Sequence, residues 1–190
     1  MPALTFLKIA VVTTRVLACS LMLACSPAAA TDAIVAARQA SMKKMAAAAR
    51  TIAEMFDGKR AYDAAGFKLA AATLSARTGP ALITEFPEGS LGAPSGARPE
   101  IDQARPEFEA LARHIGRLAD SLAAKAEEAP AEITSDMRMG TGIPMDGGSL
   151  LGKRPNAPQA DPAKLPAEHL LHLILQDCTS CHSKFRQKVE

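Results

Sequence analysis

The chain has 190 residues, of which 48% are hydrophobic and 22% are charged, as expected for one globular domain and not for a disordered protein. Only 4% are aromatic, so the core must be built mainly from Ala, Leu, Ile and Met, which favours helices and argues against a β-sandwich or barrel. A formal net charge of +2 gives no basic surface that would indicate nucleic-acid binding.

The N-terminal 30 residues have the pattern of an export signal. Lys8 and Arg15 are the only charges in it, an apolar run covers residues 16–24, and an Ala-x-Ala site ends at Ala30. The run is too short for the roughly 20 residues of a membrane-spanning helix. We therefore expect a signal peptide of residues 1–30, a periplasmic location and no transmembrane span.

Cys25 offers a second interpretation of this leader. The residues Leu-Met-Leu-Ala before it loosely resemble a bacterial lipobox, in which the cysteine becomes the lipidated N-terminus. The competing small-residue site at Ala30 favours a soluble exported protein over a lipoprotein. Cleavage there removes Cys19 and Cys25, so that Cys178 and Cys181 are the only cysteines of the mature chain.

Two helical patterns open the mature chain. Apolar residues recur at helical spacing over about residues 33–56, and Asp57-Gly58 ends this pattern. A second pattern covers about residues 60–77. We expect its buried face to consist of Tyr62, Ala65, Leu69, Ala72 and Ala76. Residues 79–104 are rich in Pro and Gly and predict a connector.

Two more helical patterns follow. The third covers about residues 105–127 and has the clearest apolar stripe, which consists of Phe108, Leu111, Ile115, Leu118 and Leu122. Residues 129–164 are broken by Gly and Pro and predict an extended loop. The fourth covers about residues 166–188, with Pro166 well placed at a helix start. Four amphipathic helices that each bury one stripe predict an all-α, antiparallel four-helix bundle spanning residues 31–190.

The fourth helix contains a C-x-x-C-H pattern, Cys178-Thr179-Ser180-Cys181-His182, which is typical of haem c attachment. On a helix, Cys178 and His182 lie one turn apart and Cys181 flanks the same face. One turn therefore offers two thiols to the haem vinyl groups and one imidazole to the iron. We expect one covalently bound haem c.

Three other interpretations of the cysteine pair are weaker. A thioredoxin-like pair usually opens a helix after a strand, and here the pair lies near the end of a helix. A zinc site needs a fourth ligand, and the mature chain has no second cysteine pair. A disulfide between residues i and i+3 does not fit a continuous helix easily.

Three segments together resemble the class II cytochromes c, the cytochrome c′ family. Residues 178–186 resemble its C-x-x-C-H-x-x-F-R ending, residues 38–43 resemble its first helix, and residues 86–90 resemble its F-P-x-G-S/T connector. The resemblance covers most of residues 33–128 and 166–190. The sequence departs from the family pattern at Asp102, where the family has tryptophan, and in the long insertion between these two parts.

The resemblance implies roles for five residues. Cys178 and Cys181 would form the thioethers and His182 would be the proximal iron ligand. Arg38 matches an arginine near a haem propionate, where a guanidinium can pair with a carboxylate. Arg186 matches a basic residue near the proximal face, although a favourable charge at the helix C-terminus explains it equally well.

Met42 decides between two functions, because it lies where the family places its distal residue. In methionine-ligated, low-spin members this residue binds the iron, and the protein exchanges single electrons with redox partner proteins. In cytochrome c′ proper the distal residue only packs on the haem, and the iron binds NO or CO. We favour the electron carrier, with gas binding as the alternative and Met45 as a second candidate for either role.

Family members are often dimers through their first two helices, so a homodimer is also expected. The sequence contains no identifiable nucleophile–base pair, so we do not expect an enzyme. Weaker candidates for a metal or haem ligand are His114, His169, His172, Met137, Met139 and Met145.

Overall fold

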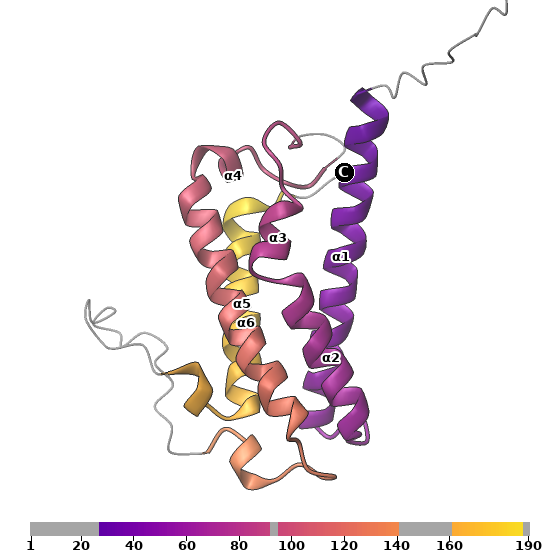
Figure 1. The fold of residues 1–190 in the computed structure, drawn as a ribbon, viewed down its shortest axis with the longest axis vertical. Helices are drawn as coiled ribbons and strands as arrows, with labels where there is room; N and C mark the ends of the chain where they lie inside the picture. Colours follow the sequence, from indigo (N-terminus) through magenta and orange to yellow (C-terminus); the bar gives the residue numbers. More distant parts are fainter. Residues whose placement is uncertain (1–26, 92–94, 141–160, 188–190) are drawn as a thin grey trace, which may run out of the picture.

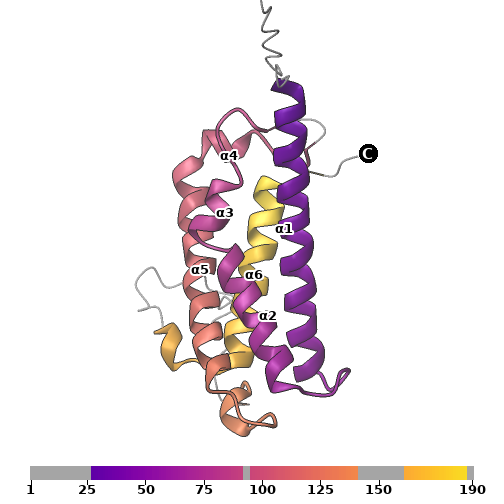
Figure 2. The ribbon, with the colours of Figure 1, turned by 45° about the vertical axis from the view of Figure 1, so that its right-hand side comes forward.

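The computed structural model describes residues 27–91, 95–140 and 161–187, and these form a four-helix bundle (Figure 1). The long helices are α1 (Pro27–Phe56), α2 (Ala64–Arg77), α5 (Arg105–Glu127) and α6 (Ala167–Phe185). They run alternately up and down (Figure 2). The helices α1 and α5 do not contact each other closely, and each of them packs against both α2 and α6. The predicted all-α antiparallel bundle is confirmed, and the described residues contain no strand beyond one isolated bridge.

The ends of α1 differ in how well they were predicted. The helix begins at Pro27, earlier than the expected residue 33, because proline and the alanines after it fit a first helical turn. Its end at Phe56 agrees with the prediction, since Gly58 adopts a φ of 70° and turns the chain. Residues 1–26, most of the predicted leader, lie outside the described residues.

The connector after α2 contains two short helices that were not predicted, α3 (Pro80–Thr84) and α4 (Glu100–Gln103). Pro80 starts α3 and Pro99 precedes α4, so these prolines begin helical turns here instead of preventing them. Each helix is too short to show a periodic apolar pattern. The connector is tied to α5 by Arg105, whose Nη1 donates to the carbonyl of Phe86 at 2.6 Å.

The predicted buried face of α2 is wrong. The helix buries Phe67, Ala70, Ala71 and Leu74. Leu69, expected in the core, is 71% exposed. Apolar residues cover both sides of α2, so their spacing does not select one. Burying the ring of Phe67 with Leu74 removes far more apolar area from water than burying a row of alanines, and hydrophobic stabilisation follows that area.

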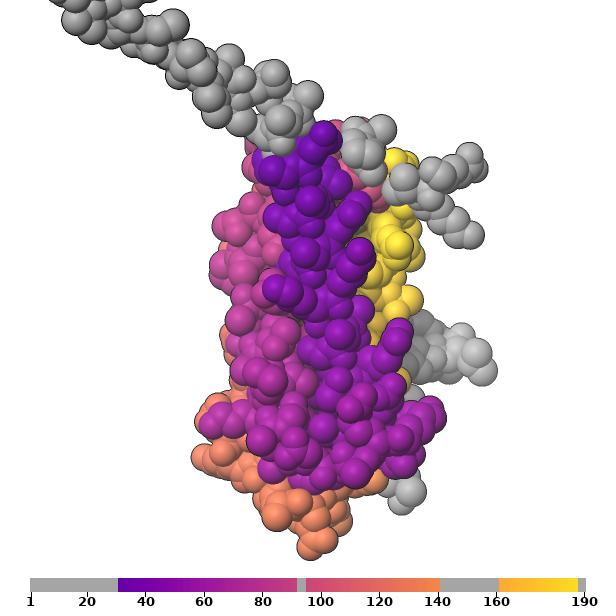
Figure 3. All heavy atoms as spheres, turned by 90° about the vertical axis from the view of Figure 1, so that its right-hand side faces the viewer, coloured from indigo at the N-terminus to yellow at the C-terminus, as the bar shows by residue number. Residues whose placement is uncertain are grey.

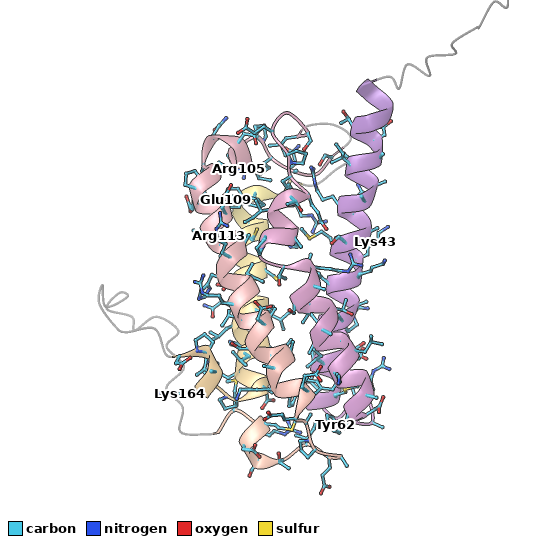
Figure 4. The ribbon with its side chains drawn as sticks, viewed as in Figure 1. Lys43, Tyr62, Arg105, Glu109, Arg113 and Lys164 are labelled. Atoms are coloured by element: carbon cyan, nitrogen blue, oxygen red, sulfur yellow. The ribbon has the colours of Figure 1, made fainter. Side chains whose placement is uncertain are left out.

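The stripe predicted for α5 does face the core, with only Leu111 partly exposed. Gly116 lies in this helix against the turn before α3. A Cβ added to Gly116 would lie 2.7 Å from Cα of Gly79, which itself adopts a φ of 60°. Glycine at both positions therefore allows α5 and this turn to approach. On the outer side of α5, Arg105, Glu109 and Arg113 form consecutive ion pairs of 3.2 and 2.5 Å (Figure 4).

The first part of the predicted extended loop packs on the end of the bundle opposite the haem motif. Met137 is 6% exposed and belongs to the main core cluster, which also contains Phe56. Arg138 Nη1 donates to the carbonyl of Phe56 at 2.6 Å. The hydroxyl of Tyr62, which Figure 4 labels at this end of the bundle, donates to the carbonyl of Pro130 at 3.2 Å. Met137 is therefore core and not a haem ligand. Met145 lies outside the described residues.

Candidate functional site

An apolar pocket opens between α1 and α6, at the end of the bundle where α6 finishes. These two helices lie side by side on the face drawn in Figure 3. Its volume is about 430 Å³, within the usual range of about 300–1,000 Å³ for cofactor sites. Arg38 and Met42 of α1 line one wall, and Cys181, His182 and Phe185 of α6 line another. The fold thus brings together residues that are about 140 positions apart in the sequence.

Three phenylalanines give the pocket its apolar wall. Phe108 of α5 packs edge-on against Phe86 of the connector and Phe185 of α6, with ring centroids 5.1 and 5.5 Å apart. Leu82 and Ile101, from α3 and α4, are buried in the same cluster. The two short helices that sequence analysis missed therefore close the pocket on the side away from solvent.

A backbone bridge joins the connector to the end of α6 beside the pocket. Ala97 pairs with Arg186 in an isolated antiparallel bridge. Arg98 N donates to the carbonyl of Phe185 at 3.0 Å, and Gln187 N donates to that of Gly96 at 2.9 Å. These bonds hold the connector against the helix that carries the C-x-x-C-H motif.

The two cysteines of the motif occupy different surroundings. Cys181 is 8% exposed and lines the pocket, whereas Cys178 is half-buried, contacts the main core cluster and does not line the pocket. Burial raises the pKa of each thiol to about 11, and the nearby Asp177 adds to the shift. Both thiols are therefore protonated near neutral pH and are poor nucleophiles for disulfide exchange.

His182 lies on the solvent-exposed rim of the pocket and makes no side-chain hydrogen bond to any described residue. Although it is exposed, partial desolvation by its surroundings lowers its pKa, and the positive charge of Arg186 acts in the same direction. Both effects favour the neutral imidazole, which is the form that ligates a metal ion.

Arg38 is a buried cation at the pocket, only 4% exposed. Its Nε donates to the carbonyl of Glu85 at 3.0 Å, and its two terminal nitrogens donate to Ser95 Oγ at 3.0 Å and Ser90 Oγ at 2.9 Å. Its guanidinium also stacks 4.1 Å from the ring centroid of Phe86. These bonds use three of the five N–H donors of the guanidinium, so two are left for an anion in the pocket.

Sequence analysis did not predict the partners of Arg38. Ser90 belongs to the connector segment that resembles the cytochrome c′ family, so the sequence contained a signal for it. Ser95 and Glu85 carried no such signal, because only the folded connector brings them to α1. No carboxylate forms an ion pair with Arg38 among the described residues. Burial lowers the pKa of its guanidinium, an effect that the charge of Glu85 opposes.

The structure separates the two methionine candidates. Met42 is half-buried and lines the pocket. Met45 is also half-buried, but it packs between the main core cluster and the cluster of the three phenylalanines, and it is not part of the pocket lining. Of the two thioethers, the one on the pocket wall is that of Met42.

Comparison with known families shows which family the chain belongs to. A family model described as Cytochrome C′ matches residues 33–140, more than half of the chain. The chain belongs to the cytochrome c′ family. Members of this family bind one covalent haem c, so this is a haem protein. The match ends before the C-x-x-C-H motif of α6, which the structure folds back onto the matched region.

Solved structures of cytochromes c′ share the fold. The protein from Shewanella frigidimarina has a TM-score of 0.59 and 19% identity, and the alignment covers 83% of this chain and 97% of that chain. Cytochrome c′ from Thermochromatium tepidum gives 0.57 and 22%, covering 83% and 98%. That from Alcaligenes xylosoxidans gives 0.57 and 18%, covering 83% and 97%. No curated protein sequence matches the chain.

The pocket has the chemistry that a cytochrome c′ haem requires. Its walls are apolar enough to cover a porphyrin, an imidazole and a thiol come from one turn of α6, and a buried guanidinium retains free donors for a haem carboxylate. The unpaired buried charge of Arg38 is the most informative of these features. Burying a cation without an anionic partner is costly, so its position at a pocket indicates an anionic ligand there.

The other candidate ligands lie apart from the pocket lining. His114 Nδ1 lies 2.7 Å from Oδ2 of Asp177, which joins α5 to α6. His169 is half-buried and His172 is exposed, near the start of α6. Within the described ranges no group of three or more His, Cys, Asp or Glu side chains is arranged to hold a metal ion. None of the described helices is long and apolar enough to cross a membrane.

Proposed function

We propose that this member of the cytochrome c′ family carries single electrons and that Met42 and His182 would hold its haem iron. One observation supports the proposal above all: Met42 and His182 line the same pocket from different helices, α1 and α6. A thioether and an imidazole on two walls of one pocket would both reach a bound haem iron, and a thioether ligand would raise its reduction potential.

Each residue of the pocket has a defined task in this proposal. Haem c supplies a one-electron iron couple when bound. Cys178 and Cys181 fix the porphyrin to α6, and Arg38 donates to a haem carboxylate. The phenylalanine wall excludes water on the inner side, whereas the open side between α1 and α6 is left for electron exchange with redox partner proteins. The proposal assigns no reaction on a substrate.

Gas binding is the second candidate function. Among the proteins of similar fold is a nitric oxide complex of a cytochrome c′ variant from Alcaligenes xylosoxidans, 19% identical to this chain with a TM-score of 0.57. In this alternative Met42 only packs on the haem. The iron then keeps an open position for NO or CO.

Visible absorption spectra of the wild type and Met42→Ala, each oxidised, reduced, and reduced under CO, separate the two functions. For an electron carrier we expect sharp low-spin bands that resist CO in the wild type and a high-spin, CO-binding spectrum in Met42→Ala, because the substitution removes the sixth ligand. Met45→Ala is the matched control and should keep the wild-type spectrum. A high-spin spectrum that shifts readily with CO in all three proteins assigns gas binding instead.

We also propose that the chain is exported with cleavage after Ala30 and acts in the periplasm as a homodimer. An open groove between α1 and α2 supports the dimer, since the exposed Leu69 and the small side chains Ala47, Ala72 and Ala76 line it. The small alanine side chains allow two helix pairs to approach closely, and the exposed leucine gives them an apolar surface to bury. One cytochrome c′ of similar fold, 19% identical, is described as having a ligand-controlled dimer dissociation.

Leu69→Glu should convert the dimer to a monomer, because it places a carboxylate in a desolvated apolar contact. Sedimentation velocity over a range of concentrations measures this. Leu175→Glu is the matched control, since Leu175 is the other large hydrophobic residue exposed in the described ranges, 40% exposed on α6, and its substitution should leave the dimer intact. A wild-type protein that sediments as a monomer at high concentration contradicts the dimer.

A further inference from the structure

Glu85 is an acidic side chain held directly behind the buried arginine of the pocket. It ends α3, and its carbonyl accepts the Nε–H of Arg38 at 3.0 Å. Its carboxyl oxygen Oε2 is buried and makes no hydrogen bond, and the Ser41 hydroxyl beside the carboxyl makes none either. A buried carboxylate oxygen without a donor is costly to keep charged, so this environment favours the neutral acid.

The groups around this carboxyl are few and identifiable. Ser41 and Arg38 approach from α1, Arg77 approaches from α2, and Arg105 of α5 bonds the carbonyl of the next residue. Burial raises the pKa of Glu85, while the Ser41 hydroxyl and the charges of Arg77 and Arg38 act in the opposite direction. The pKa of the Glu85 carboxyl therefore lies above its ordinary value, because burial outweighs these opposing effects.

Arg38 links this carboxyl to the pocket. The same guanidinium that contacts the backbone of Glu85 lines the pocket and has two free donors for a haem carboxylate. An electron added to the haem makes the pocket more negative by one charge. Because a nearby negative charge disfavours a carboxylate, the protonated form of Glu85 gains stability relative to the ionised form on reduction.

We propose that Glu85 is a redox-linked proton site: its carboxylate takes one proton from water when the haem iron takes one electron, and releases that proton on oxidation. Charge balances, since each added electron is accompanied by up to one added proton. The electron comes from the electrode or redox partner. The proposal rests on the haem site proposed above, and it holds whether the iron is six-coordinate or binds a gas.

The midpoint potential measured against pH by spectroelectrochemistry tests this assignment. In the wild type we expect the potential to fall as pH rises through the titration of Glu85, because the ionised carboxylate disfavours the added electron. The side chain of Glu85→Gln is neutral at every pH, so the midpoint potential of this variant should remain at the value that the wild type has at low pH and should not fall as pH rises. Glu85→Asp should restore a fall, shifted in pH.

Glu88→Gln is the matched control. Glu88 lies on the same connector three residues further on, and it is exposed. It should keep the pH dependence of the wild type. A fall of equal size in Glu85→Gln and the wild type overturns the proposal, as does a fall that Glu88→Gln also abolishes.

Proton uptake provides a readout that does not depend on any variant folding. Reduction of the wild type in weakly buffered solution, followed with a pH indicator, should consume protons over the pH range in which the potential falls. A wild type that takes up no protons overturns the proposal even if Glu85→Gln does not bind haem. A purified wild type without haem bands contradicts the proposed haem function itself, so the two failures are distinguishable.

Discussion

A chain in which Cys178 and Cys181 are both replaced by alanine is expected to contain no covalently bound haem, whereas the wild type contains one per chain. The thioethers have no substitute, since these are the only two cysteines that the proposed cleavage after Ala30 leaves in the chain. Intact-mass measurement under denaturing conditions checks this, because only a covalent cofactor stays with the chain. The expected wild-type mass is that of residues 31–190 plus one haem.

Cys25→Ala is the control for this experiment. If the leader is removed after Ala30, the variant gives the same mature mass and haem content as the wild type. A variant that is no longer processed identifies a lipoprotein and contradicts the predicted cleavage site. Haem retained under denaturing conditions by the chain that lacks Cys178 and Cys181 contradicts their assignment as thioether anchors.

The sequence was sufficient to predict the buried face of a helix where one face carries all the large apolar residues. On α5, Phe108, Ile115, Leu118 and Leu122 are all buried, as predicted. On α2 the apolar residues lie on two faces, and the prediction chose the one that the structure exposes. The spacing of apolar residues indicates that a helix has an apolar face, but it does not indicate whether the core or a second chain covers that face.

The pocket was predicted only in part, for a related reason. The C-x-x-C-H motif and the Arg38–Met42 spacing are local patterns, so each could be recognised on its own helix. The buried hydrogen bonds of Arg38 depend on how the connector folds over α1, and Glu85 and Ser95 reach it from residues 47 and 57 positions away. No periodic pattern encodes such contacts. The sequence of the proline-rich connector therefore did not predict how the pocket is closed or that the Glu85 carboxyl lies behind it.

Replacing Arg38 with methionine is expected to lower the midpoint potential of the haem. A buried cation opposes the additional positive charge of the ferric state, so its removal stabilises that state. Two unit charges about 10 Å apart interact by about 1.7 kcal/mol at an effective dielectric constant of about 20. For a one-electron couple this corresponds to a fall of about 70 mV, which spectroelectrochemistry resolves easily.

Two further variants distinguish the charge of Arg38 from its packing. Arg38→Lys retains the charge but loses the planar fork that donates to Ser90, Ser95 and the Glu85 carbonyl, so it should destabilise the protein while keeping the potential near that of the wild type. Arg50→Met removes an exposed charge from the same helix and should hardly change the potential, because solvent and salt screen it. A fall of similar size in Arg50→Met and Arg38→Met, or no fall in Arg38→Met, contradicts an electrostatic role for the buried guanidinium. A fall confined to Arg38→Met shows that the buried charge itself raises the potential.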